Sequence, residues 1–274
     1  MGKTNDSFGT DKKRYFVHSL AKGLSVLQAF PPAGRPLTLT EIARHLKVNK
    51  TTVTRLCYTL TELGFLIRDR HRLFHLTPKV LTLGHALVSG LGWREAAESF
   101  LQGLFEEVQE TVNLAILDDS EILYVIRLKR DKFLPIDIRM GSKLPVYCTG
   151  PGKVLMAMGP PEKTKPILAK LEFRPLTPRT IISLAQFKKE LESVRKKGYA
   201  ISDEEFAEGN RAIAAPILDK NGIAVAAINF AVPTKRYSRA DLVDRLLEPL
   251  LQTAKDISIA WQHLDTPVSV VDYY

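Results

Sequence analysis

Apolar residues recur at helical spacing between Ser19 and Phe30. Leu20, Leu24 and Leu27 are three or four positions apart, so they fall on one face of an α-helix. A run rich in proline and glycine follows and cannot continue the helix, because proline lacks a backbone donor and glycine is conformationally permissive. The pattern therefore predicts one short helix with an apolar stripe.

Two further helices are marked by capping residues. Thr38 and Glu41 fit a capping box, in which the threonine oxygen accepts from a free N–H group of the helix and the glutamate reaches back to the cap. We therefore expect a helix from Leu39 to Leu46. After a three-residue break, Asn49 can cap a third helix from Lys50 to Leu63, which a glycine closes.

The third helix separates its apolar and polar positions. Five residues follow the i, i+3, i+4, i+7 pattern and should be buried: Val53, Leu56, Cys57, Leu60 and Leu63. The other face is rich in hydrogen-bond donors and carries no acid: Lys50, Thr51, Thr52, Thr54, Arg55 and Tyr58. Two short helices joined by a tight turn, with such a face on the second, form a helix-turn-helix that reads the major groove.

A basic hairpin is expected after this helix. The runs Phe65 to Arg68 and Leu73 to Leu76 read as strands, and the turn between them is strongly cationic. Arg68, Arg70 and Arg72 would place positive charge on a wing that contacts DNA phosphates. The alternative interpretation is a three-helix unit with an ordinary solvated basic face.

The rest of the chain mixes strand-like runs with amphipathic helices. Asn221-Gly222 lies between two apolar runs and is a strong hairpin signal. Strands joined by hairpins, with helices grouped between them, favour an α+β domain built on an antiparallel sheet flanked by helices. The expected strands are Thr111 to Leu117, Glu121 to Leu128, Leu134 to Arg139, Arg211 to Leu218 and Ile223 to Val232. The expected helices are Trp93 to Glu110, Ser183 to Lys197 and Ser238 to His263.

One loop could hold an anion. Residues 141–153 contain several glycines and lead into an apolar helix from Val154 to Met158. The free N–H groups and the dipole of a helix start favour a negative ligand such as a carboxylate. The loop fails as a nucleotide-binding P-loop, because Tyr147 stands where the first glycine belongs and no Ser or Thr follows Lys153. An ordinary capped helix start without a ligand is the alternative.

Charge divides the chain into two parts. Residues 1–92 carry 14 Lys or Arg against 5 Asp or Glu, whereas residues 93–274 carry 25 of each, so the first third holds the whole net charge of +9. A basic part of this size attracts a polyanion such as nucleic acid or an acidic membrane. The chain has no apolar run long enough to span a bilayer and its start is polar, so we expect a cytoplasmic protein that does not bind membranes.

Little in the sequence points to catalysis or metal binding. Cys57 and Cys148 lie far apart, which gives neither a disulfide framework nor a zinc spacing. Five of the six histidines lie in the basic part, so none is placed to activate Cys148. The acidic run from Asp203 to Glu208 is more typical of a solvated face or a set of salt bridges than of a metal site or an acid/base cluster. We expect no enzyme activity, no cofactor and no metal.

The residues resemble one known family. Leu39-Thr40-Glu41-Ile42-Ala43, Thr51-Thr52-Val53-Thr54-Arg55-Leu56 and Leu63-Gly64-Phe65-Leu66 resemble the winged helix-turn-helix domain of the IclR family of bacterial transcription regulators. Leu144-Pro145, Cys148 to Ala157, Gly198-Tyr199 and Arg211 to Ile217 are similar to its effector domain. Residues 136–149 and 225–229 also resemble the branch that regulates breakdown of aromatic acids. The chain departs from that branch at Gly150-Pro151-Gly152-Lys153.

The resemblance implies a GAF-like effector domain with a pocket between the sheet and the helix start. In that pocket Gly150 would offer backbone N–H groups to a carboxylate, and Asn229 would be the polar anchor on the sheet. The full set of candidate effector residues is Met140, Leu144, Tyr147, Cys148, Thr149, Gly150, Asp203, Ala212, Asn229 and Ala231. Ser202 matches a polar position near the mouth of the pocket less securely. Ala212 and Ala231 would favour a bulky ligand of low polarity.

These observations predict a regulator whose binding to a double-stranded DNA operator is controlled by a small, aromatic carboxylic acid. Homodimers, or dimers of dimers, would place two recognition helices on a palindrome. The rival interpretations are a ligand-independent architectural or DNA-binding protein and an enzyme that uses Cys148 as nucleophile. The expected organisation is a flexible tail at 1–15, the winged domain at 16–77, a linker helix at 78–92, the effector domain at 93–265 and a tail at 266–274.

Overall fold

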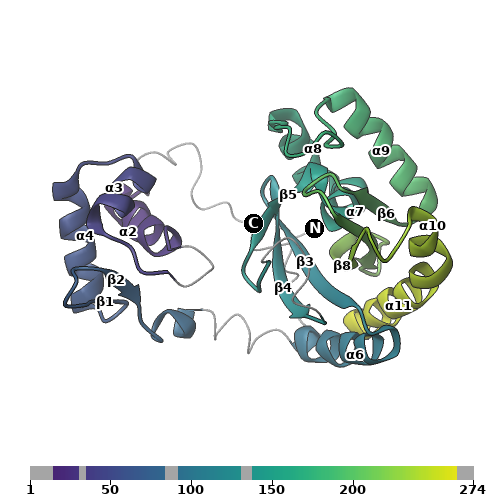
Figure 1. The fold of residues 1–274 in the computed structure, drawn as a ribbon, viewed down its shortest axis with the longest axis horizontal. Coiled ribbons are helices and arrows are strands. Elements are labelled where there is room, and N and C mark those ends of the chain that lie inside the picture. Colours follow the sequence, from purple (N-terminus) through teal and green to yellow (C-terminus); the bar gives the residue numbers. More distant parts are fainter. Residues whose placement is uncertain (1–14, 31–34, 84–91, 131–137, 264–274) are drawn as a thin grey trace, which may run out of the picture. The chain divides into compact units, whose positions relative to one another are not determined.

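The computed structural model describes residues 15–30, 35–83, 92–130 and 138–263. By its internal contacts the chain divides into two compact units, Met1–Ser89 and Gly90–Tyr274. Figure 1 shows helices and a small hairpin in the first unit and a large sheet with helices in the second. The predicted tails lie outside the described residues, apart from Tyr15, and so does the part of the predicted linker helix at 84–91.

The first unit has the predicted order of elements. It consists of α2 (His18–Gln28), α3 (Leu39–Leu46), α4 (Lys50–Glu62), β1 (Leu66–Arg68) and β2 (Phe74–Leu76), and the two strands pair antiparallel. Thr38 and Glu41 form the capping box of α3, and the side chain of Asn49 caps α4 by accepting from the N–H group of Thr52. The fully buried centre of this unit includes Val26, Ile42, Val53 and Cys57.

Three leucines expected in this core are not buried. Leu20 and Leu24 are 62% and 50% exposed, because α2 buries the stripe that contains Val26 instead. Leu63 is 51% exposed, since it is the C-cap of α4 and the chain turns away at the following glycine, whose φ is +75°. Helical spacing correctly predicted the helices here but not which side of α2 packs against α4.

The second unit is an α+β domain, as the sequence predicted. Its sheet has the strand order β5-β4-β3-β8-β7-β6, and every neighbouring pair is antiparallel. The strands are β3 (Thr111–Asp118), β4 (Glu121–Leu128), β5 (Lys143–Pro145), β6 (Ala200–Asp203), β7 (Asn210–Leu218) and β8 (Ala224–Pro233). The short strands β5 and β6 form the two edges of this sheet.

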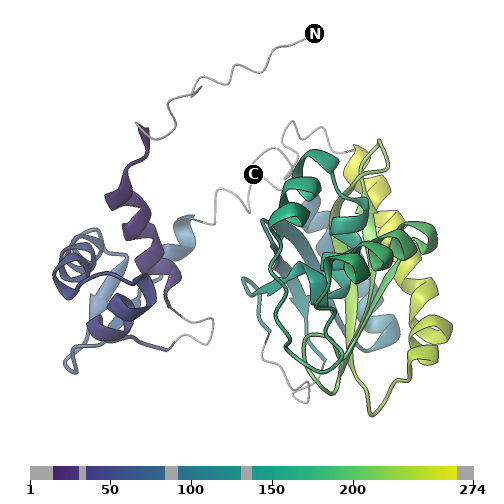
Figure 2. The ribbon, with the colours of Figure 1, turned by 90° about the horizontal axis from the view of Figure 1, so that it is seen from above.

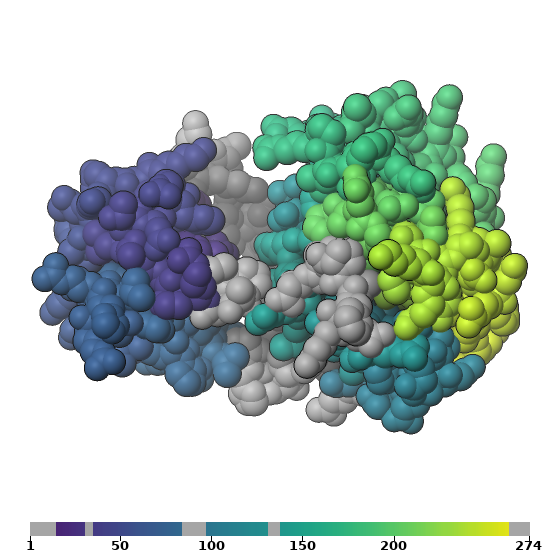
Figure 3. All heavy atoms as spheres, viewed as in Figure 1, coloured from purple at the N-terminus to yellow at the C-terminus, as the bar shows by residue number. Residues whose placement is uncertain are grey.

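Helices cover both faces of the sheet. On one face lie α6 (Gly92–Val108), α10 (Arg239–Asp241), a π-helical turn (Leu242–Leu246) and α11 (Leu247–His263). On the other lie α7 (Gly150–Met158), α8 (Pro161–Lys170) and α9 (Leu184–Lys197), as Figure 2 shows from above. In the space-filling view of Figure 3, the green α8 and α9 and the yellow α10 and α11 form much of the visible surface of this unit. Each face therefore has its own apolar core.

Several segments differ from the sequence prediction. Neither edge strand was predicted, because β5 and β6 are too short for an alternating pattern and β5 ends in a proline, which suits an edge. Of the predicted strand Leu134 to Arg139, residues 134–137 lie outside the described part and residues 138 and 139 are not in a strand. The helix expected from Val154 begins four residues earlier, at Gly150, where Thr149 caps it.

Candidate functional site

The exposed face of α4 carries the residues predicted to contact DNA. Lys50, Thr51, Thr54, Arg55 and Tyr58 are exposed, and Thr52 is half-buried. The Thr54 hydroxyl donates to the Lys50 carbonyl at 2.8 Å, so it is partly engaged by its own helix. Arg55 and Lys50 carry donors of the kind that pair with the acceptors of guanine and with phosphate oxygens.

The predicted wing is a hairpin braced by one aspartate. Oδ1 of Asp69 accepts from the backbone N–H groups of His71 and Leu73 at 2.8 and 2.9 Å, and its Oδ2 lies 2.8 Å from Nε2 of His75. The hydrogen bond from His75 and those from the turn backbone lower the pKa of Asp69. Asp69 thus shapes the turn, and Arg68, Arg70 and Arg72 are exposed.

One cation beside this surface was missed in the sequence. A cavity of about 340 Å³ between α2 and α4 is lined by Ser19, Lys22, Thr52, Arg55, Leu56 and Thr59. It brings Lys22 and the Ser19 hydroxyl to the same hollow as Arg55. The sequence holds only a weak signal for Lys22, since a single lysine on an amphipathic helix is most often exposed to solvent without a specific role.

On the sheet of the second unit, the face that packs against α7 carries two rows of predicted effector residues. Across the central strands, Asn229 of β8 is paired with Ala214 of β7. In the next row Ala231 is paired with Ala212, which in turn is paired with Ser202 of the edge strand. Cross-strand partners point to the same face of a sheet, so these side chains share one surface. Apart from Asn229 and the edge residue Ser202, these side chains are alanines.

The start of α7 lies directly over this surface. A Cβ atom added to Gly150 would stand 3.1 Å from Cβ of Ala214, and the hydroxyl of Ser202 donates to the carbonyl of Cys148 at 2.8 Å. The side chain of Thr149 accepts from the N–H group of Gly152 and donates to the Pro145 carbonyl at 3.0 Å. The structure therefore brings Gly150, Ala212, Asn229 and Ala231 together, with Ser202 at the edge.

Cys148 is buried beneath this helix start and is chemically quiet. Burial raises the pKa of its thiol to about 12, so the nucleophilic thiolate is not populated near neutral pH. Its Sγ lies 3.7 Å from the Pro145 carbonyl. The same effect raises the pKa of Cys57 to about 11. Neither cysteine has the electropositive, exposed setting that a catalytic thiol requires.

Four other candidate effector residues lie apart from the Asn229 surface. Met140 is 64% exposed in the loop before β5, and Leu144 is buried in the core beneath α7. Tyr147 packs against Phe173 and its hydroxyl donates to the backbone carbonyl of Arg174 at 3.1 Å. Asp203 pairs in register with Arg211 and forms an ion pair with it, on the face opposite to Ser202.

A buried ion pair supports the α7 helix from below. Lys153 is 1% exposed, and its Nζ donates to Glu205, to Glu190 at 3.2 Å and to the Ile201 carbonyl at 3.0 Å. Burial raises the pKa of Glu205, while Lys153 opposes this shift. Lys153, the lysine of the glycine-rich loop, thus links α7 to α9 and β6.

Two polar residues beside Asn229 were not predicted. Asn113 of β3 is fully buried and is paired in register with both Asn229 of β8 and Arg127 of β4. The guanidinium of Arg127 donates to Oδ1 of Asn113 at 2.7 Å. The available signal was one asparagine inside an apolar strand, but only the strand register shows that it meets Asn229.

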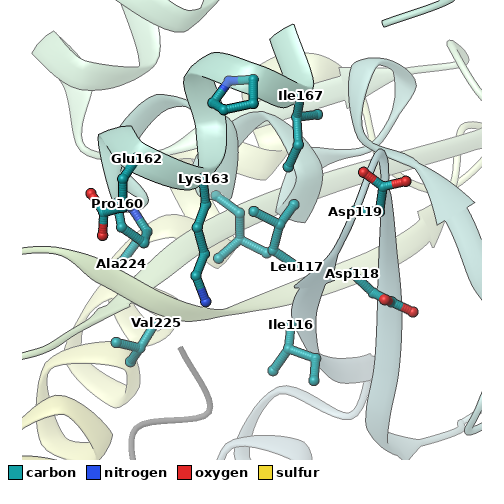
Figure 4. A pocket seen from close by; sticks show the side chains of 12 residues that line it. Ile116, Leu117, Asp118, Asp119, Pro160, Glu162, Lys163, Ile167, Ala224 and Val225 are labelled. Carbon is teal, nitrogen blue, oxygen red and sulfur yellow. The ribbon is translucent and has the colours of Figure 1, made fainter. Parts of the chain in front are cut away.

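A separate cavity lies at the other end of the sheet. It has a volume of about 400 Å³ and is lined mostly by apolar residues, among them Ile116, Leu155 and Val225. Lys163 points into it from α8 (Figure 4). None of the ten predicted effector residues lines this cavity.

The described residues contain neither a metal cluster nor a membrane-spanning helix. No group of three or more His, Cys, Asp or Glu side chains in this part of the chain is arranged to hold a metal ion. Nor is any helix within it long and apolar enough to cross a membrane.

Comparisons with known proteins agree for both units. Two family profiles match: the IclR helix-turn-helix domain over residues 19–70 and the bacterial transcriptional regulator IclR C-terminal domain over residues 85–259. The Pca regulon regulatory protein of Pseudomonas putida is 33% identical, over 88% of this chain and 83% of that protein. The p-hydroxybenzoate hydroxylase transcriptional activator of Acinetobacter baylyi is 32% identical, over 88% of this chain and 91% of its own.

A solved structure shows the same fold. The crystal structure of an IclR homolog from Microbacterium hydrocarbonoxydans, complexed with 4-hydroxybenzoate, has a TM-score of 0.74 and 23% sequence identity. The match covers 88% of this chain and 98% of that one. The profiles and both relatives describe transcription regulators and not enzymes, which confirms what the sequence predicted.

Proposed function

Because this chain belongs to the IclR family of bacterial transcription regulators, we propose that a small carboxylic acid bound between α7 and the sheet controls its binding to an operator. The observation that carries this proposal is the buried amide of Asn229, which faces the start of α7 among alanines. A helix start and a buried amide are groups that recognise a carboxylate.

The DNA half of the proposal rests on the basic first unit. A dimer would place two α4 helices in successive major grooves, so the operator would be a palindrome with half-sites about one helical turn apart. Arg55 and Lys50 would contact bases or phosphates, with Thr51, Thr52, Thr54 and Tyr58 beside them. Arg68, Arg70 and Arg72 of the wing, together with Lys22, would contact the phosphate backbone.

The effector half of the proposal favours an aromatic acid. Ala212 and Ala231 form a row of small apolar side chains next to the Asn229 row, and this surface suits a flat ring better than a short aliphatic acid. A protein of the same fold is complexed with 4-hydroxybenzoate, and one relative is named the p-hydroxybenzoate hydroxylase transcriptional activator. Both observations support the same ligand class for this chain.

The test separates the two halves with two variants. Purified protein is screened by thermal shift against aromatic and aliphatic carboxylic acids, since a ligand at a hundredfold excess over its Kd stabilises the folded state by about 2.7 kcal/mol. Operator DNA is selected by the wild-type protein from a random pool. Arg55→Ala should abolish operator binding and retain the acid-induced shift, whereas Asn229→Ala should retain operator binding and lose the shift.

Three results would contradict the proposal. Normal operator affinity of Arg55→Ala would remove α4 from the interface, and an unchanged acid response of Asn229→Ala would remove this amide from the pocket. No shift with any acid would favour the ligand-independent DNA-binding alternative.

A further inference from the structure

A row of polar side chains crosses the middle of the sheet. Arg127, Asn113 and Asn229 stand side by side on β4, β3 and β8, because each is the register partner of the next. Asn113 and Asn229 are 0% and 1% exposed. Alanines lie next to the row on the same face, including Ala115 and Ala227, which pair with each other two residues along the strands. A buried polar row of this kind is costly unless its hydrogen bonds are satisfied.

The hydrogen bonds in this row all run in one direction. A guanidinium has donors only, so the amide oxygen of Asn113 must face Arg127. Nη1 of Arg127 lies 2.7 Å from Oδ1 of Asn113. The NH₂ group of Asn113 therefore faces Asn229 and donates to its Oδ1 at 3.4 Å. This leaves Nδ2 of Asn229 as the last donor, and among the described residues it has no hydrogen-bond partner.

The reverse orientation of Asn229 is unfavourable for a simple reason. If its amide were rotated, its NH₂ group would meet the NH₂ group of Asn113, and two donors would face each other in a buried position. The charge of Arg127 also polarises the row, which strengthens the terminal donor. Hydrogen bonds from such a donor to an anionic oxygen are stronger than those to a neutral one.

We propose that Arg127 is a positioning residue for the effector: acting through Asn113, it fixes Asn229 with its NH₂ group towards the ligand, so that the pocket selects an anionic oxygen over a donor. This inference rests on the proposed function of the Asn229 surface and names its selectivity. Arg127 and Asn113 need not touch the ligand. They determine which end of the Asn229 amide the ligand meets.

The test compares one acid with its neutral amide. Binding of 4-hydroxybenzoate and 4-hydroxybenzamide to the full chain is measured by calorimetry, and the ratio of their Kd values is the readout. Asn113→Asp keeps a partner for Arg127 but can no longer donate to Asn229, so the Asn229 amide should rotate. The preference for the acid should then fall by about tenfold or more, which corresponds to about 1.4 kcal/mol.

Matched variants separate the row from general charge effects. Arg127→Met should reduce the acid preference, and Arg127→Lys should restore it in part, since lysine also offers only donors. Lys129→Met removes an exposed cation two residues away from Arg127, outside the row, and should leave the preference unchanged. An equal loss of acid preference in Lys129→Met and Arg127→Met would overturn the inference, because simple attraction between a positive charge and the acid would then explain both results.

A ligand-free measurement distinguishes failure of this inference from failure of the proposed function. In protein labelled with ¹⁵N-asparagine, the side-chain NH₂ signals of Asn229 are assigned by their loss in Asn229→Asp. Arg127→Met and Asn113→Asp should shift these signals, and Lys129→Met should not. Unchanged signals in the first two variants overturn the positioning role. Shifted signals in a protein that binds no carboxylic acid support the role and overturn the proposed effector.

Discussion

Glu41 is the residue that most clearly links local structure to pH. Its Oε2 accepts from the backbone N–H group of Thr38 at 2.8 Å and from the Thr38 hydroxyl at 2.9 Å, and Arg35 donates to its Oε1 at 3.1 Å. These contacts, the backbone hydrogen bond first, lower the pKa of Glu41 from 4.5 to about 2. The start of α3, the helix that precedes the recognition helix α4, therefore depends on an ionised carboxylate.

The sign of this effect gives a prediction. A carboxyl group whose pKa is lower in the folded state stabilises that state above its unfolded pKa, and this stability is lost as pH falls. In the wild-type chain, exchange protection of the α3 amides should therefore fall as pH decreases from about 4.5 towards 2. Glu41→Gln should be less protected at neutral pH and should lose less protection on acidification. Hydrogen exchange corrected for the intrinsic rate at each pH measures this difference.

Thr38→Ala is the matched control, because it removes the hydroxyl partner and keeps both the backbone N–H group and the carboxyl group. It should weaken the pH dependence in the same direction, since the side-chain hydrogen bond from Thr38 also lowers the pKa of Glu41. An unaltered acid profile in both variants would show that the capping box does not stabilise α3.

At the scale of elements, the start of α7 depends on a glycine for steric reasons. A Cβ atom at Gly152 would stand 2.3 Å from the carbonyl oxygen of Val146 and 2.4 Å from its Cα. Both atoms are backbone and cannot rotate away. Gly152→Ala should therefore destabilise the C-terminal unit by about 3 kcal/mol or more, at the upper end of overpacking effects, and lower its melting temperature.

A second glycine provides the opposite expectation. Gly103 lies in α6, and a Cβ atom there would have nothing within 4 Å. Gly103→Ala should stabilise this helix by about 0.5–1 kcal/mol, because glycine is a poor helix former. Thermal unfolding of both variants measures the contrast. Similar melting temperatures for the two would contradict the close approach of α7 to Val146.

Strong local patterns predicted whole elements. The capping box at Thr38 and the apolar spacing after it correctly predicted the bounds of α3, and the β-branched run predicted those of β4. Edge strands of three or four residues carry no such pattern, so β5 and β6 were missed. The exposed side of α2 was also misjudged, because spacing alone cannot say which neighbour a helix packs against.

In the candidate site, too, some residues were recognisable from local sequence and others only from the structure. The glycine-rich segment and Asn229 were recognisable in the sequence, and the structure places Gly150 and Asn229 on facing elements. Arg127 and Asn113 join the site only through strand register, and Asp203 lies on the other face of the sheet because side chains alternate along β6. Register and alternation are set by tertiary pairing, which a pattern within one strand does not contain.

At the scale of the whole molecule, the separation of charge suggests a division of labour. The basic residues of the first third suit a polyanion, and the balanced remainder suits a small ligand. Operator affinity should accordingly fall steeply with salt, because each phosphate contact releases a counterion. The affinity for a small acid should depend on salt far less, since the Asn229 surface is buried and screened from the solvent.

Control of the operator by an acid requires that the two sites be coupled, and thermodynamic linkage makes the coupling reciprocal. If a bound acid changes the operator Kd by some factor, bound operator must change the acid Kd by the same factor, which is typically about 5- to 150-fold. We expect equal factors when operator binding is followed by fluorescence anisotropy and acid binding by calorimetry at one salt concentration. An acid that stabilises the protein but has the same Kd with and without operator would be a ligand without regulatory effect, because an effector acts only through different affinities for the two states.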